Sequence, residues 1–130
     1  MKKLIALGVF LCLALACGKG KNDNSNSLKT SFTGTYQLKE VLADPGDGSG
    51  TFQPVTSSKT ITFTTNGTVS SNGDLCNMSV DSNTPTSGTY SLADSSITVT
   101  NCMKLYFEVS GNELIINYPC IEPCRARFTK

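Results

Sequence analysis

From residue 32 onward the sequence is built from short runs in which apolar and polar residues alternate. Tyr36 and Leu38 are separated by a polar residue, as are Ile61 and Phe63, and this period of two returns toward the C-terminus. Successive side chains of a β-strand point to opposite faces, so the pattern indicates strands with one buried face. Glycine, asparagine, aspartate and proline, which favour turns, stand between the runs. The pattern therefore predicts an all-β domain.

Composition and turn signals add detail to this prediction. After residue 17 the chain holds three alanines against 31 serines and threonines, a composition that disfavours helices. Asn66-Gly67 and Gly111-Asn112 mark tight hairpin turns, because these residue types tolerate positive φ. Strands joined by short turns form an antiparallel meander, and about eight of them close into a small barrel without exposed edges. We expect strands at about 34–42, 59–65, 68–71, 88–92, 96–102, 105–109, 114–118 and 124–128, and a short irregular strand at 75–80.

Several aromatic residues stand within these predicted strands. They either line a ligand cavity or fill the barrel as ordinary core. A barrel of about eight strands encloses just enough space for side chains or one small ligand. Short strands and the absence of tryptophan favour a filled interior. The aromatic residues are Tyr36, Phe63, Tyr90, Phe107, Tyr118 and Phe128.

The N-terminus has the pattern of an export signal. Lys2 and Lys3 are followed by an uncharged, mostly apolar run at 4–16. This run is too short for a membrane-spanning helix, which needs about 20 residues, and fits the apolar part of a signal peptide. It ends in LALACG at 13–18, which resembles the lipobox of bacterial lipoproteins, although alanine stands at 14 where leucine is commonest.

The lipobox resemblance implies that Cys17 becomes a lipidated N-terminus, and two or more acyl chains hold a protein stably on a membrane. An ordinary secretory signal cleaved after Ala16, leaving a free thiol, is the alternative. We expect a signal peptide at 1–16, the lipidated cysteine with a flexible polar tether at 17–31, and the barrel domain at 32–130. The protein would then be anchored in the cell envelope, and Gly18 mildly favours the outer membrane.

Four cysteines remain in the domain: Cys76, Cys102, Cys120 and Cys124. An even number in an oxidising compartment predicts two disulfides, with three possible connectivities. Cys120 and Cys124 could close a local loop, which would leave Cys76 to pair with Cys102. A four-cysteine zinc site is the alternative, but such sites usually have two close pairs, and this chain has one loose pair. Two disulfides would also stabilise a domain with a small core.

Four segments of the domain resemble a known family. They are FTGTYQL at 32–38, ITFTTNGTV at 61–69, SGTYSL at 87–92 and GNELII at 111–116. Their order and spacing resemble those of the motifs in the lipocalin-like domains of small bacterial lipoproteins. Tyrosine stands at 36 where the family motif has tryptophan. The resemblance covers about residues 32–129 and implies an eight-stranded, calycin-like barrel. It implies little about activity, because a fold does not determine a function.

Several functions are disfavoured by what the chain lacks. It has no histidine, which removes the commonest general base and the usual zinc ligand. Cysteines held in disulfides cannot act as thiolate nucleophiles. Without Lys2 and Lys3, nine lysines and arginines stand against ten aspartates and glutamates, so no basic surface for nucleic acid is expected. We expect no catalytic residue, no cofactor and no metal.

The acidic residues are the remaining candidates for chemistry. Asp44 and Asp47 lie in a long loop at about 43–58 together with several glycines. They could ligate calcium, but the loop lacks the spacing and the closing glutamate of a calcium loop. A glycosidase pair with Glu40 or Glu108 is another alternative, although no spacing fixes such a pair. Turn formation is the simpler interpretation of both aspartates.

Phe52 and Val55 are unexpected in the same loop because they are apolar. They either fold over the barrel end as a lid or contact a ligand or partner. Arg125 and Arg127, on one face of the last predicted strand, could bind an acidic partner, although solvation at a sheet edge is the simpler interpretation.

Our main functional hypothesis is a membrane-anchored, non-catalytic protein. It would bind a small apolar ligand or a protein partner through loop 43–58 and the open barrel end. An inhibitor of an exported hydrolase, lysozyme or a protease, acting through a disulfide-closed loop at 119–124, is one alternative. A structural component of the cell envelope is another.

Overall fold

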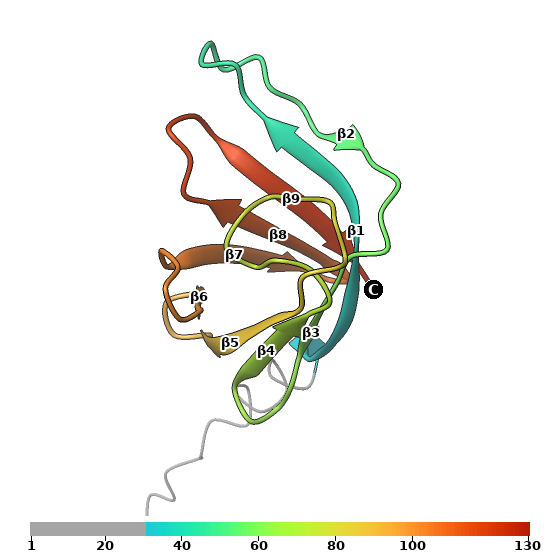
Figure 1. The fold of residues 1–130 in the computed structure, drawn as a ribbon, viewed down its shortest axis with the longest axis vertical. Coiled ribbons are helices and arrows are strands. Elements are labelled where there is room, and N and C mark those ends of the chain that lie inside the picture. The colour runs from blue at the N-terminus through green and yellow to red at the C-terminus, as the bar shows by residue number, and fades with distance from the viewer. Residues whose placement is uncertain (1–30) are drawn as a thin grey trace, which may run out of the picture.

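The computed structural model describes residues 31–130, which form one antiparallel sheet that closes on itself (Figure 1). Neighbouring strands pair in the order β1-β3-β4-β5-β6-β7-β8-β9, and β9 pairs again with β1. The eight-stranded meander barrel predicted from the sequence is therefore present. A short additional strand, β2, pairs with β1. The strands are β1 (Gly34–Ala43), β2 (Gln53–Pro54), β3 (Thr60–Phe63), β4 (Thr68–Ser71), β5 (Thr86–Ser91), β6 (Ser96–Thr98), β7 (Leu105–Ser110), β8 (Glu113–Tyr118) and β9 (Cys124–Thr129).

The long first strand closes the barrel because it pairs along both of its edges. The beginning of β1 pairs with β3, from Gly34 opposite Phe63, while most of its length pairs with β9 as far as Ala43 opposite Cys124. The register with β9 shifts after Leu38, and such a bulge bends a strand and increases its twist. A bent β1 can therefore join the first and last strands of the ring.

The alternation in the sequence decides which residues form the core. In β8, Leu114, Ile116 and Tyr118 are buried, while Ile115 and Asn117 between them are partly exposed. The same period buries every second residue of β3 and β4. A register slip of one residue would turn these apolar side chains to solvent, so the alternation also fixes the register.

Two expectations about the strands were wrong. Residues 75–80 form no strand, because side chains there bond to the nearby backbone: the Asp74 carboxylate accepts from the N–H of Cys76 (2.8 Å). Such local bonds compete with sheet pairing. The strand expected at 96–102 ends at Thr98, since Asn101 has a φ of 63° and turns the chain.

Candidate functional site

Apolar side chains pack together inside the barrel, and a hollow of about 240 Å³ lies next to Phe32 and Phe107. Sixteen apolar residues, each at most 7% exposed, form one core. The rings of Phe32, Phe63 and Phe107 pack together with centroids 4.4 to 5.8 Å apart. Of the six aromatic residues singled out from the sequence, five are buried, and Tyr90 packs against the core half-buried. This packing supports the interpretation of the aromatic residues as ordinary core.

Residues 72–85, between β4 and β5, cross one end of the barrel, and we call them the plug (Figure 1). Leu75 of the plug is fully buried in the core. Lys59, just before β3, is also fully buried, and its ammonium group donates to backbone carbonyls of the plug. A buried cation is tolerated when it is hydrogen-bonded, so this contact both satisfies Lys59 and holds the plug. The acceptors are the carbonyl oxygens of Asp74 (2.6 Å), Ser79 (2.7 Å) and Asn77 (3.4 Å).

Lys59 was not singled out from the sequence, although a signal was present. It stands two residues before Ile61 and four before Phe63, and therefore at an inward position of the same alternation. Burial lowers the pKa of Lys59 to about 8, while the negative charges of Asp74 and Asp81 act in the opposite direction. The ammonium group is therefore mostly protonated at neutral pH.

Tyr118, on β8, also lies near the plug. Its side chain is buried, and its hydroxyl has no hydrogen-bond partner within residues 31–130. Burial raises the pKa of Tyr118, and the charge of Asp74 raises it further. In contrast, the buried hydroxyl of Tyr36 donates to the carbonyl oxygen of Phe32 at 2.7 Å. Among the described residues, the Tyr118 hydroxyl is thus buried without a hydrogen bond that would offset its loss of hydration.

Residues 31–130 contain two disulfides, with the connectivity that the sequence favoured. Cys76 and Cys102, with Cα atoms 5.5 Å apart, tie the plug to the turn between β6 and β7. Cys120 and Cys124, with Cα atoms 5.9 Å apart, close a small ring between β8 and β9. The first bridge fixes the plug and the second fixes the shape of the last turn.

Asp44 organises the loop that follows β1. Its carboxylate accepts three backbone hydrogen bonds, and the one from Gly50 contributes most to lowering the pKa of Asp44. Asp47 accepts from the backbone N–H of Ser49 at 2.9 Å, and the Ser49 hydroxyl is the main cause of its lowered pKa. Both aspartates therefore act as turn formers. The donors to Asp44 are the N–H groups of Gly46 (2.7 Å), Gly48 (3.0 Å) and Gly50 (2.8 Å).

Phe52 and Val55 do not form a lid, so that interpretation was wrong. β2, which lies between them in the sequence, pairs with the middle of β1, and the loop runs back along the outside of the barrel (Figure 1). The guanidinium group of Arg127 lies over the ring of Phe52, with its Cζ atom 3.9 Å from the ring centroid. Val55 packs against the margin of the core. The plug, and not loop 43–58, closes the end of the barrel.

The two arginines of β9 have different surroundings. β9 is paired on both sides, so the interpretation of these arginines as residues at a sheet edge was wrong. Arg127 forms ion pairs with Glu40 through Nη1 and with Glu113 through Nε (3.4 Å). Arg125 is half-buried, and among the described residues its side chain has no hydrogen bond or ion pair.

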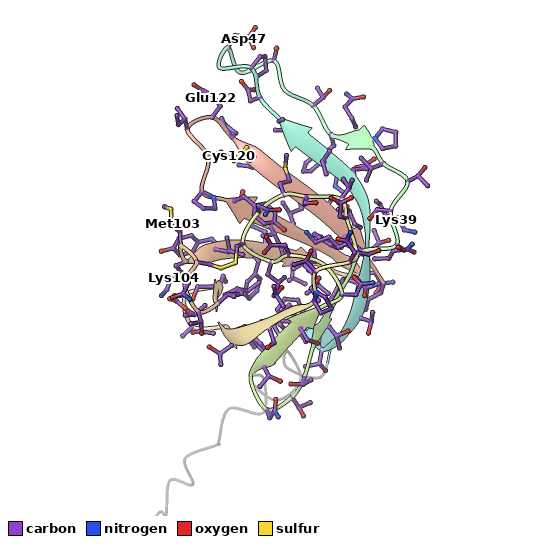
Figure 2. All side chains as sticks on the ribbon, in the orientation of Figure 1. Lys39, Asp47, Met103, Lys104, Cys120 and Glu122 are labelled. Carbon is purple, nitrogen blue, oxygen red and sulfur yellow. A yellow bond between two sulfur atoms is a disulfide. The ribbon has the colours of Figure 1, made fainter. Side chains whose placement is uncertain are left out.

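Arg125 lines a hollow of about 300 Å³ beside the Cys120–Cys124 ring, together with Asn117 and Tyr118. Ile121 in this ring is fully exposed, and Met103, next to the other disulfide, is 67% exposed. Figure 2 shows the labelled residues Asp47, Glu122, Cys120 and Met103 along one side of the molecule. We call residues 44–50, 103–104 and 119–125 the rim.

Some predictions concern residues that the structure does not describe. Cys17, the signal peptide at 1–16 and the tether up to residue 30 lie outside the described residues, so lipidation and export stay predictions. Within residues 31–130, no helix is long and apolar enough to span a membrane. The same residues contain no cluster of three or more histidine, cysteine, aspartate or glutamate side chains that could hold a metal.

Comparison with known proteins identifies one relationship. A family model described as "Lipocalin-like domain" matches residues 32–116, which include β1 through β7 and most of β8. No curated protein and no solved structure matches the chain.

Proposed function

Because this chain belongs to the family of lipocalin-like domains, we propose that it is a non-catalytic binding protein of the cell envelope that holds a protein partner at its rim. The rim would face away from the membrane on a tether that begins at a lipidated Cys17. The lipobox-like sequence at 13–18 and the polar stretch that follows it support this anchor.

The packed core is the observation that carries the proposal. A ligand inside a barrel needs space, and here the core side chains and Leu75 of the plug pack into one apolar cluster. The hollow of about 240 Å³ next to Phe32 and Phe107 is partly open to the outside. The rim, in contrast, presents a fully exposed isoleucine in a turn closed by a disulfide. Exposed apolar side chains in rigid turns are suited to protein recognition, because little conformational entropy is lost on binding. A protein partner therefore fits better than a small apolar ligand.

The Cys120–Cys124 ring also favours one more specific role, the inhibition of an exported hydrolase. Such an inhibitor inserts a preorganised turn into the active-site cleft of an enzyme, and Ile121 is presented in this way. Lysozyme and protease rates measured with a slight excess of the protein test this role. Strong inhibition of one enzyme would support it, and unchanged rates across the panel would exclude it.

Photo-crosslinking in intact cells tests the proposed function. A photoreactive amino acid replaces Asp47, Met103 or Ile121 at the rim, and, as a matched control, the exposed Thr65 in the turn between β3 and β4. We expect a discrete protein adduct from rim positions and none from position 65. Absence of an adduct at all three rim positions, or an equal adduct at position 65, would contradict the proposal.

A further inference from the structure

We propose that the hollow beside the Cys120–Cys124 ring docks an acidic segment of the partner protein. A carboxylate of that segment pairs with Arg125, and a neighbouring aliphatic side chain packs on Ile121. This inference rests on the proposed function and adds to it the site and the chemistry of the partner.

The surroundings of Arg125 point to an anionic group. On the same strand, Arg127 forms ion pairs with Glu40 and Glu113 and stacks on Phe52, although its Nε makes no hydrogen bond among the described residues. Arg125 is also half-buried, but no acidic residue among those described pairs with it. A guanidinium group that is partly desolvated and unpaired gains most from a carboxylate, which it binds through two parallel hydrogen bonds.

Ile121 supplies the apolar half of the site. It belongs to the ring that borders the hollow, and its side chain is fully exposed although it is large and aliphatic. The Cys120–Cys124 bridge restrains the backbone of the turn, and Ile121 and Arg125 both line the hollow. A segment that offers one carboxylate beside one aliphatic side chain matches this arrangement.

The other charges of the rim limit where the carboxylate can lie. Asp44 and Asp47 accept backbone hydrogen bonds from their own loop, and they do not line the hollow. Lys104 is already paired with Asp94 at 3.0 Å. Glu122 lies against the turn at Gly46, where an added Cβ would be 3.2 Å from its carboxyl carbon. Because Glu122 also lines the hollow, its charge opposes an acidic ligand, and its removal should strengthen binding.

The experiment uses two fluorescein-labelled peptides that differ in one group, Leu-Asp-Leu amide and Leu-Asn-Leu amide. Their binding to the whole purified protein is measured by fluorescence anisotropy. We expect the aspartate peptide to bind more tightly, and its affinity to fall about tenfold in Arg125→Gln. Arg125→Lys should retain part of the affinity, because lysine keeps the charge but not the paired geometry. Glu122→Gln should bind more tightly than the wild type.

Lys39→Gln is the matched control, since it removes one positive charge from an exposed residue away from the rim (Figure 2). It should leave the affinity unchanged. Equal binding of the two peptides, an affinity in Arg125→Gln within about twofold of the wild type, or an equal loss in Lys39→Gln would overturn the inference. If such a result is found while the rim positions still form protein adducts in cells, the acidic segment is rejected as the bound group. The proposed function, a protein partner at the rim, would then still stand.

Discussion

Three buried polar side chains differ in whether they are hydrogen-bonded inside this small barrel. The Lys59 ammonium is surrounded by plug carbonyls, and the Tyr36 hydroxyl donates to Phe32. The Tyr118 hydroxyl has no partner among the described residues. A typical hydrogen bond contributes about 1 kcal/mol to stability, whereas an unsatisfied buried group costs about 1–3 kcal/mol. Removal of the hydroxyl group should therefore change the free energy of unfolding in opposite directions at Tyr118 and at Tyr36.

Tyr118→Phe should raise the free energy of unfolding by about 1 kcal/mol, because it removes a buried hydroxyl without a partner. Tyr36→Phe is the matched control and should lower it by a similar amount, because it removes the bond to the Phe32 carbonyl. Urea denaturation at neutral pH measures both. A loss of stability in Tyr118→Phe equal to that in Tyr36→Phe would show that the Tyr118 hydroxyl is hydrogen-bonded after all.

Lys59 makes the stability depend on pH in a defined direction. Its pKa is about 8 in the folded protein and near 10.5 in the unfolded chain, so the unfolded chain binds more protons between these values. The free energy of unfolding should therefore rise from pH 8 toward pH 10, relative to Lys59→Met. Denaturation of both proteins at pH 7.5, 8.5 and 9.5 measures the difference. A difference that stays constant or falls over this range would contradict the lowered pKa.

The role of a single residue could be predicted where that role depends on its neighbours in the sequence. The turn-forming role of Asp44 and Asp47 follows from the glycines around them, and the structure agrees. Arg125 and Arg127 look equivalent in the sequence. They differ because the groups that contact Arg127 come from β1, β8 and the loop before β2, whose positions only the fold determines.

At the scale of elements, alternation and turn chemistry predicted most strands. The hairpins at Asn66-Gly67 and Gly111-Asn112 are present, with both glycines at positive φ as expected. The plug was not predictable, because its conformation depends on Lys59 and on a disulfide to a distant turn. β2 has only two residues, too few for any periodic pattern.

Gly88 in β5 should be intolerant of any side chain. A Cβ there would lie 2.3 Å from the carbonyl oxygen of Thr98 and 3.0 Å from a methyl carbon of Val99. We expect Gly88→Ala to lower the free energy of unfolding by about 1–3 kcal/mol, because β5 and β6 must move apart. Gly111→Asn is the control, since nothing lies within 4 Å and asparagine tolerates its φ of 58°. Similar stabilities of both variants in urea would contradict the close packing at Gly88.

At the scale of the whole molecule, the two disulfides constrain very different lengths of chain. Their cysteines are 26 and 4 residues apart. From loop-closure entropy, removing Cys76–Cys102 by double serine substitution should cost about 3.5 kcal/mol, and removing Cys120–Cys124 about 2 kcal/mol. Denaturant unfolding of the two double variants measures these losses. A larger loss of stability on removal of Cys120–Cys124 would contradict this order. It would show that the short ring stabilises the whole barrel in addition to shaping the rim.

The closed ring and the packed core lead to the central claim, that recognition takes place on the outside of the barrel. Native mass spectrometry of the protein extracted from the membranes of its own host tests this most directly. We predict one species, a chain that begins at an acylated Cys17, contains two disulfides and carries no other small molecule. A stoichiometric apolar molecule that stays bound through desalting would contradict the claim, because it would need space that the core side chains occupy.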